Sequence, residues 1–321
     1  MEVNFNLGSL GKSENLDLNQ VFDLAIIGSG PAGYSAAIYG RRYELNTIVI
    51  GKEHGGMITE TNLVENYPGF KEISGLELMN RFKEHALKFD AKILNDTIVE
   101  IKKEENHFIL RTQNNEFIKS KTIIIATGTK RRQLNAPGEK EFLNKGVSYC
   151  AICDAPFYKG KVVGVVGGSD AAASSAVQLT QYASKIYMFV RSKVRAEPYW
   201  QKLLKKNSDK IEILEGVQVK EIFGDEKVRG VKLDNGQVVE LDGLFIEIGS
   251  MPVSELTKHI GVEIDEKGYI VVDKKMRTNV PGVYAAGDVT NLLPEFRQVV
   301  VAAAQGAIAA HSAYRFFKEQ Q

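Results

Sequence analysis

The sequence predicts an α/β protein of two domains, because the order strand, glycine-rich turn, helix, strand occurs twice along the chain. The first copy spans residues 22–50 and carries its turn at 28–33. The second copy spans residues 161–190 and carries its turn at 167–172. Such a unit opens a Rossmann-like three-layer domain, so the duplication indicates two domains of this type.

The remaining elements follow from runs of apolar residues bounded by polar residues and glycines. Within the two copies we predict strands over 22–27, 46–50, 161–166 and 185–190, and helices over 34–42 and 173–182. Outside them, the predicted strands are 93–101, 108–112, 117–119, 122–128, 211–214, 218–223, 228–233 and 238–241. An alanine-rich helix over 298–317 closes the chain.

Charge and composition exclude several classes of protein. Lys and Arg number 41 against 40 Asp and Glu, and a net charge of +1 provides no general attraction to nucleic acid or anionic membranes. The sequence has no run of eighteen apolar residues, which argues against a membrane span. Residues 1–19 are polar, unlike a signal peptide, and we interpret them as an extension of a cytoplasmic protein.

The two cysteines of the chain, Cys150 and Cys153, form a Cys-x-x-Cys pair. A secreted disulfide scaffold has more cysteines, and a structural zinc site needs four ligands, which the five scattered histidines do not complete. We therefore expect no metal. In a cytosolic protein the pair is either redox-active or coincidental, and this pattern alone leaves both readings open.

The first glycine-rich turn has the spacing Gly28-x-Gly30-x-x-Gly33 between a strand and a helix. The first glycine permits the tight turn, the second lets the backbone approach a pyrophosphate, and the third lets helix and strand pack closely. The turn predicts dinucleotide binding. The acid that usually ends the second strand would fall near Gly51, and the nearest acid is Glu53.

Farther along, Asp288 follows a strand of small residues and can accept a hydrogen bond from a ribityl hydroxyl.

Together these motifs resemble the low-molecular-weight thioredoxin reductases, which are flavin-dependent. The resemblance covers residues 22–321 and is carried by Gly-Ser-Gly-Pro-Ala-Gly, Gly55-Gly56-Met57, Ala-Thr-Gly, Cys-Ala-Ile-Cys-Asp, Gly-Val-Tyr-Ala-Ala-Gly-Asp and Arg297-Gln298. It implies that Cys153 lies beside the flavin and exchanges electrons at its C4a position. It also implies that Cys150 is the thiolate that attacks the incoming disulfide, and that Asp154 moves the proton.

The resemblance further implies a discontinuous FAD-binding domain, residues 20–132 and 254–321, with an inserted NAD(P)H-binding-type domain over 133–253 that carries the cysteines. Links near Gln133 and Pro252 would act as hinges between them. The implied FAD contacts are Gly28, Ser29, Gly30, Pro31, Ala32, Gly33, Gly51, Gly56, Met57, Asn66, Thr127, Gly128, Gly287, Asp288, Arg297 and Gln298.

The second nucleotide site departs from the family pattern. The implied NAD(P)H contacts are Gly167, Gly168, Ser169, Asp170, Ala171, Arg191 and Arg195. Ser169 stands where the family has a glycine, and the family's His-Arg-Arg motif is reduced to Val190-Arg191-Ser192, followed by Arg195. The two arginines would either clamp the 2′-phosphate of NADPH or be solvated. We favour NADPH as the donor, with a ferredoxin or another carrier as the alternative.

The resemblance therefore implies a homodimeric thioredoxin-disulfide reductase with thioredoxin or a thioredoxin-like protein as its partner. Two other readings remain open at this point. A flavin reductase or ferredoxin–NADP reductase of the same fold would work without a dithiol, and Cys150 and Cys153 argue against it. A non-catalytic FAD sensor would use the dithiol to report the redox state to a partner, and turnover with thioredoxin would distinguish it from an enzyme.

Overall fold

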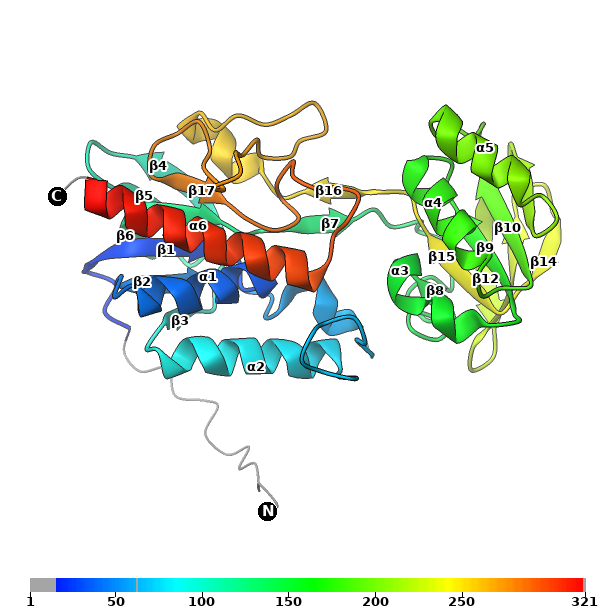
Figure 1. Ribbon diagram of the computed structural model, residues 1–321, viewed down its shortest axis with the longest axis horizontal. Helices are drawn as coiled ribbons and strands as arrows, with labels where there is room; N and C mark the ends of the chain where they lie inside the picture. Colours follow the sequence, from blue (N-terminus) through cyan, green and yellow to red (C-terminus); the bar gives the residue numbers. More distant parts are fainter. Residues whose placement is uncertain (1–15, 62, 320–321) are drawn as a thin grey trace, which may run out of the picture. The chain divides into compact units, whose positions relative to one another are not determined.

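The computed structural model describes residues 16–61 and 63–319, which form two compact units (Figure 1). The first unit combines three segments of the chain, 16–57, 79–128 and 252–319. The second combines 58–78 with 129–251. The chain passes between the units beside two short strands, β7 (Thr129–Arg131) and β16 (Ser250–Pro252), which form a two-stranded sheet. The predicted domain limits at 132 and 254 stay a prediction.

A seven-stranded sheet forms the centre of the first unit, in the order β3-β2-β1-β6-β5-β4, with β17 also paired to β6. Strands β1, β2, β3, β6 and β17 run parallel, and β4 and β5 add an antiparallel edge. The strands are β1 (Val21–Ile27), β2 (Thr47–Ile50), β3 (Lys92–Leu94), β4 (Ile98–Lys103), β5 (Phe108–Thr112), β6 (Phe117–Ile125) and β17 (Val283–Ala285). Strands β1, β2 and β17 are almost wholly buried, as expected for the middle of a sheet covered on both faces.

Helices α1 (Pro31–Arg42) and α6 (Val299–Glu319, red in Figure 1) pack closely against each other in this unit. A Cβ at Gly306 would fall 2.1 Å from the Ala32 carbonyl oxygen, so only glycine permits this approach. The Ser35 Oγ also donates to the Ala303 carbonyl at 2.6 Å. The 3-10 helix Glu255–Ile260 also belongs to this unit, whereas helix α2 (Gly75–Lys88) and the 3-10 helix Gly56–Glu60 are each divided between the two units.

The second unit has three layers, with a five-stranded parallel sheet in the middle, ordered β11-β10-β9-β15-β8. Consecutive residues of its strands face opposite cores. Met188 packs with the helices, and Phe189 packs with the antiparallel sheet β12-β13-β14. The strands are β8 (Val147–Ser148), β9 (Val162–Val166), β10 (Lys185–Val190), β11 (Ile211–Glu215), β12 (Val219–Gly224), β13 (Val228–Leu233), β14 (Val238–Glu240) and β15 (Gly243–Ile246). The helices are α3 (Ala151–Asp154), α4 (Asp170–Leu179), α5 (Pro198–Lys206) and the 3-10 helix Ala155–Tyr158.

The predicted α/β fold is confirmed, with one predicted strand divided in two. Residues 93–101 form β3 and β4, which lie at opposite ends of the first sheet. The break falls at Asp96, whose buried carboxylate accepts hydrogen bonds from the backbone N–H groups of Thr97 and Asn114. The predicted extension lies largely in residues 1–15, outside the described residues. Over residues 16–61 and 63–319, no helix is long and apolar enough to cross a bilayer.

Candidate active site and nucleotide-binding turns

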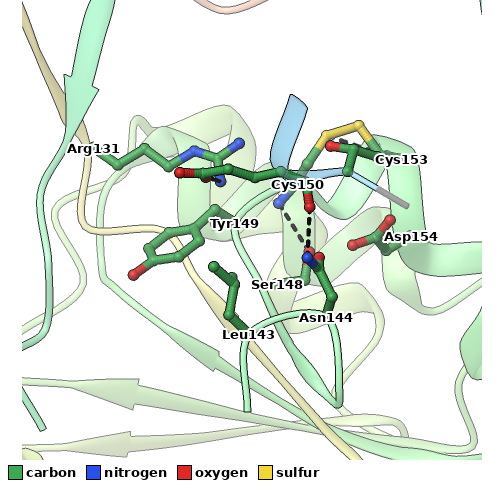
Figure 2. A pocket seen from close by; sticks show the side chains of 10 residues that line it. Arg131, Leu143, Asn144, Ser148, Tyr149, Cys150, Cys153 and Asp154 are labelled. Atoms are coloured by element: carbon green, nitrogen blue, oxygen red, sulfur yellow. Dashed lines mark hydrogen bonds and ion pairs between the residues drawn. A yellow bond between two sulfur atoms is a disulfide. The ribbon is translucent and has the colours of Figure 1, made fainter. Parts of the chain in front are cut away.

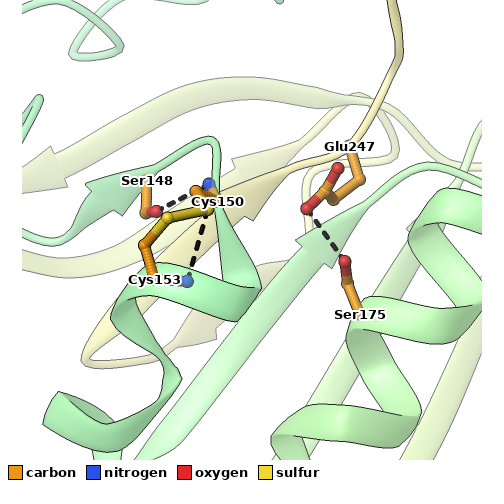
Figure 3. Close-up of a disulfide and its surroundings, with 5 residues drawn as sticks. All are labelled: Ser148, Cys150, Cys153, Ser175 and Glu247. Atoms are coloured by element: carbon orange, nitrogen blue, oxygen red, sulfur yellow. Dashed lines mark hydrogen bonds between the residues drawn. A yellow bond between two sulfur atoms is a disulfide. The ribbon is translucent and has the colours of Figure 1, made fainter. Parts of the chain in front are cut away.

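Cys150 and Cys153 form a disulfide at the start of α3 in the second unit, with 5.3 Å between their Cα atoms (Figure 3). The Sγ of Cys150 accepts a hydrogen bond from the backbone N–H of Cys153 at 3.3 Å, which places this sulfur at the N-cap of α3. The backbone N–H of Cys150 donates to the Oγ of buried Ser148 at 3.0 Å. The pair is thus held between strand β8 and helix α3.

The local sequence explains why the chain turns here. Gly146 has a φ of +122°, and a Cβ at this position would lie 2.6 Å from the Val228 Cβ. Strand β8 follows directly and pairs with β15, which aligns Ser148 with Phe245. Ala151, at the beginning of α3, is buried in the core under the helices. Small residues therefore anchor the short helix, with Cys150 as its N-cap and Cys153 within it.

Asp154 lies one residue after the dithiol, and its pKa is raised (Figure 2). Burial is the main cause, because it disfavours the charged carboxylate. A hydrogen bond with the Ser148 side chain and the positive charge of Arg131 both lower the pKa, without cancelling the effect of burial. Ser148 therefore contacts both Cys150 and Asp154, and Asp154 retains a proton to higher pH than an exposed aspartate.

Arg131 and Tyr149 belong to the same pocket as the dithiol (Figure 2). The Arg131 guanidinium carbon lies 4.9 Å from the centroid of the Tyr149 ring, within cation–π range. The Tyr149 hydroxyl donates to Glu139 Oε1 at 2.5 Å, which is one reason, after burial, that the pKa of Tyr149 is raised. Glu139 is 2% exposed. The full lining comprises Glu60, Thr61, Arg131, Leu143, Asn144, Ser148, Tyr149, Cys150, Cys153 and Asp154.

In the first glycine-rich turn, two glycines are required by close packing and a third faces open space. A Cβ at Gly28 would fall 2.1 Å from the Ala126 carbonyl oxygen, and one at Gly33 would fall 1.9 Å from the Gly28 carbonyl oxygen. At Gly30 the nearest atom would be the Gly55 carbonyl oxygen, 3.7 Å away. No side chain caps α1, so its first N–H groups and its positive dipole end face this open space.

Other segments of the first unit meet this turn. A Cβ at Gly51 would collide with the Ser29 Oγ at 2.4 Å, and one at Gly287 would approach the Ala32 Cβ at 3.1 Å. The Gly287 backbone N–H donates to the Oε1 of buried Gln305 at 2.7 Å, which fixes the turn before Asp288. The loop after β2 and the turn after β17 therefore both lie against the start of α1.

The second glycine-rich turn precedes α4 and has two restricted glycines followed by a serine. Gly167 has a φ of +142°, and a Cβ at Gly168 would lie 2.7 Å from a methyl group of Val190. Ser169 has a φ of −91°, which suits any residue, and its exposed side chain does not cap the helix. The Gly168 carbonyl accepts from the Arg195 backbone N–H at 2.7 Å, so the loop with the arginines lies beside the turn.

Comparison with known proteins decides the family. The pyridine nucleotide-disulphide oxidoreductase model matches residues 22–306. This chain belongs to that family. A thioredoxin reductase of Bacillus subtilis (strain 168) is 40% identical over 310 residues, covering 94% of this chain and 96% of that protein. A thioredoxin reductase of Mycoplasma genitalium is 39% identical, covering 90% and 93%. The crystal structure of thioredoxin reductase from Streptococcus pyogenes MGAS5005 has a TM-score of 0.87 at 37% identity, covering 94% and 99%.

The turn around Gly30 fits FAD, the flavin cofactor that family membership implies. The space at Gly30 that a Cβ would fill lies at the uncapped N-terminus of α1, where a pyrophosphate is favoured. Fifteen of the sixteen implied FAD contacts lie in the first unit, and Asn66 lies in the second (residues 58–78). Two of the implied contact residues are also hydrogen-bonded within the protein. The Thr127 hydroxyl donates to the Val253 carbonyl at 2.6 Å, and Arg297 hydrogen-bonds to the Tyr269 hydroxyl.

The turn before α4 also fits a dinucleotide. Its N-cap, Ser169, makes no side-chain hydrogen bond to the helix, so the first N–H groups of α4 are available to a phosphate. Arg191 and Arg195 are exposed in the adjoining loop. Asp170 also holds the loop before α5, because its Oδ1 accepts a hydrogen bond from the Glu197 backbone N–H at 2.7 Å. The turn therefore keeps the helix N-terminus and two nearby cations, with Ser169 in place of the third glycine of the family pattern.

Sequence reasoning missed the residues that hold the predicted ones in place. Ser148 supports the dithiol, Gln305 supports the Gly287 turn, and Arg131 adds a positive charge beside Asp154. A serine two residues before a cysteine was a visible local signal for Ser148. Gln305 and Arg131 are 18 and 23 residues from the groups they affect, so no local pattern identified them.

Proposed function

We propose that this chain is a thioredoxin-disulfide reductase whose Cys150–Cys153 pair reduces a protein disulfide. The observation that supports this most strongly is the closed disulfide beside a carboxyl of raised pKa, in a chain related over nearly its whole length to thioredoxin reductases. A coincidental or structural pair would need no neighbouring proton carrier.

In the proposed reaction the dithiol exchanges with the substrate disulfide in two steps. The Cys150 thiolate attacks one sulfur of the substrate, which forms a mixed disulfide and releases the other substrate sulfur as a thiolate. The Cys153 thiolate then attacks Cys150, which releases the second substrate sulfur and leaves the Cys150–Cys153 disulfide. The substrate gains two electrons, and the dithiol loses two.

Asp154 supplies the proton for this exchange. Its raised pKa lets the carboxyl keep its proton to higher pH than an exposed aspartate does, so that it can protonate a departing thiolate. Ser148 orients both partners, because it contacts the Asp154 side chain and the Cys150 backbone. Arg131 favours the thiolate form of the cysteines through its positive charge.

The cofactors are FAD in the first unit and NADPH in the second. The first turn and α1 would hold the FAD pyrophosphate, and Asp288 would hold its ribityl chain. The second turn would hold the NADPH pyrophosphate, with Arg191 and Arg195 at its 2′-phosphate. When bound, FAD would supply the redox chemistry that links a reduced nicotinamide to a disulfide.

A second candidate keeps the same dithiol chemistry and takes electrons from a ferredoxin or another carrier. Ser169 favours it, because a side chain replaces the glycine that lets a backbone approach a pyrophosphate. The adjoining Val190-Arg191-Ser192 stretch also offers one cation fewer than the family motif. The partner in both cases is a thioredoxin or thioredoxin-like protein, and the proposed assembly is a cytoplasmic homodimer.

Three measurements on the purified protein test the proposal. Denaturation should release FAD, and a colourless protein that FAD cannot reconstitute contradicts a flavoenzyme. Anaerobic titration with NADPH and then NADH, followed by flavin absorbance, identifies the donor. If neither NADPH nor NADH in excess reduces the flavin, the second candidate is supported. Steady-state reduction of a thioredoxin, followed by its reduction of insulin disulfides, separates an enzyme from a non-catalytic sensor.

A further inference from the structure

Ser29, in the first glycine-rich turn, is tied on two sides to the loop that follows β2. Its Oγ donates to the Glu53 carbonyl at 2.9 Å, and its carbonyl accepts from the Gly55 backbone N–H at 2.9 Å. A Cβ at Gly56 would lie 3.9 Å from the Gly30 Cα, so the loop runs beside the open part of the turn. The loop and the turn therefore form two adjoining walls of the space at Gly30.

The side chain of Tyr34 lies between the turn and the loop. Tyr34 is in the first turn of α1 and is only 1% exposed. Burial raises its pKa to about 12, and a hydrogen bond with the Ser29 side chain opposes that rise. Its hydroxyl also lies 2.7 Å from Nδ1 of His54, which belongs to the loop. Tyr34 thus connects the start of α1 with His54 of the loop.

His54 extends this chain of hydrogen bonds to α2. Its Nε2 lies 2.9 Å from Asn80 Oδ1, an oxygen that only accepts, so Nε2 carries the proton. Nδ1 is then the acceptor for the Tyr34 hydroxyl. Burial lowers the pKa of His54 and the charge of Lys83 lowers it further, against the effect of the Asn80 hydrogen bond. The neutral ring is therefore the form that this arrangement stabilises.

We propose that His54 and Tyr34 are positioning residues for FAD, which fix the loop 51–57 against the turn 28–33. This inference rests on the proposed function only in requiring that FAD binds at the first turn. Neither side chain needs to touch the cofactor. Their hydrogen bonds set the separation of the two walls before FAD arrives, which reduces the conformational cost of binding. Their hydrogen bonds join residues that are 20 and 26 positions apart in the sequence, and His54 and Asn80 lie outside the glycine motif.

The test compares FAD affinity in variants that keep or remove these hydrogen bonds. H54L removes both ring nitrogens, H54Q keeps one donor and one acceptor, and Y34F removes only the hydroxyl. His107→Leu is the matched control, because His107 is a half-buried histidine of the same unit, beside β5. FAD is removed from each protein, and the dissociation constant is measured from the quenching of flavin fluorescence during titration. The melting temperature of each apoprotein is measured in parallel.

Y34F should raise the dissociation constant of FAD about fivefold, as expected for one lost hydrogen bond, and H54L should raise it at least as much, because it also removes the hydrogen bond to Asn80. The double variant should bind FAD no more weakly than H54L alone, because H54L already removes the Tyr34–His54 hydrogen bond. H54Q and His107→Leu should stay within about twofold of the original protein. The proposal is overturned if H54L and Y34F leave FAD affinity unchanged, or if H54Q is as weak as H54L. If the unaltered protein binds no FAD, the proposed function fails first.

Discussion

The backbone N–H of Cys153 donates to the Sγ of Cys150, 3.3 Å away, across the first turn of α3. A sulfur at a helix N-cap is stabilised as a thiolate, because an N–H group points at it and the helix dipole is positive there. The sulfur of Cys153 has no comparable position in the helix. The geometry therefore makes the two cysteines unequal, with Cys150 the better thiolate once the disulfide is opened.

Replacing either cysteine should abolish disulfide reduction and leave the flavin in place. We expect Cys150→Ser and Cys153→Ser each to lower thioredoxin turnover at least about a thousandfold, because hydroxyl groups cannot exchange with disulfides. The FAD content per chain, measured by absorbance after denaturation, should match that of the original protein. Full turnover by either variant would show that the dithiol is not the electron carrier.

Arg131 should make the attacking cysteine more reactive. Arg131 lines the pocket that contains the dithiol, and its charge favours the thiolate. We expect Arg131→Gln to slow alkylation of the reduced protein by iodoacetamide at neutral pH about three- to tenfold, which corresponds to a rise of the thiol pKa by about 0.5–1 unit. Lys130→Gln is the control, since Lys130 is the exposed neighbour in the same strand. Equal alkylation rates in all three proteins would show that Arg131 does not affect the reactivity of the cysteine.

Asp154 predicts a specific dependence of stability on pH. Because its pKa is raised in the folded protein, the folded state holds this proton at pH values where the unfolded chain has lost it. The resulting stabilisation is complete below the pKa of the unfolded chain and is lost as pH rises through the folded pKa. Asp154→Asn should flatten this part of the curve of unfolding free energy against pH, measured by urea unfolding. A curve parallel to that of the original protein would contradict the raised pKa.

The same substitution should also slow the reaction. Asn cannot release or accept a proton, so Asp154→Asn should lower thioredoxin turnover about a hundred- to ten-thousandfold while FAD binding is kept. The loss should appear in kcat more than in KM, because the carboxyl acts on the sulfur atoms that exchange. A variant with normal kcat would show that solvent supplies the proton.

Two glycines of the first turn should respond differently to alanine. The Cβ of Gly33→Ala would fall 1.9 Å from the Gly28 carbonyl oxygen, so we expect a loss of about 3 kcal/mol in unfolding free energy. Gly30→Ala meets nothing closer than 3.7 Å and should fold normally. Its methyl group should nevertheless weaken FAD binding at least about tenfold, since it fills the space left for the pyrophosphate. Normal affinity in Gly30→Ala would place the cofactor elsewhere.

The electron donor can be tested by restoring the family motif. Losing one charge-assisted phosphate contact costs about 1.5–3 kcal/mol, or roughly ten- to hundredfold in affinity. The original protein should therefore use NADPH with a high Michaelis constant and little preference over NADH. Ser169→Gly combined with Ser192→Arg should tighten NADPH binding and raise the ratio of NADPH to NADH activity. If neither quantity changes, and flavin stays oxidised under excess NADPH, another carrier is the donor.

Sequence reasoning recovered the elements that a local pattern defines. Predicted strands over 108–112, 185–190 and 228–233 coincide with β5, β10 and β13, because apolar runs between polar residues mark them clearly. Helix α2 was missed, although Leu78, Met79 and Ala86 supply its buried face and the Ser74 Oγ accepts from the Glu77 backbone N–H at its start. That amphipathic spacing was a readable signal.

The residues of the candidate site also fall into those that a local motif identifies and those that it does not. The cysteines, Asp154 and both glycine turns are contiguous motifs, so their positions could be named from the sequence. The contacts that hold them join distant segments, as Tyr34 and His54 do, or Gly287 and Gln305. Such pairs depend on how helices pack on a sheet, and no spacing in a single sequence encodes that packing.

The pairing of β17 with β6 has a consequence for how the protein is made. Val283 aligns with Ile123, so the first sheet recruits a strand that the ribosome adds about 160 residues later. The sheet of the second unit, by contrast, uses strands within residues 147–246. During translation the middle of the chain can complete its parallel sheet while the amino-terminal strands still await their last partner. A nascent chain that stalls before α6 emerges would have all strands of the sheet that carries the dithiol, but would lack the last helix of the first unit.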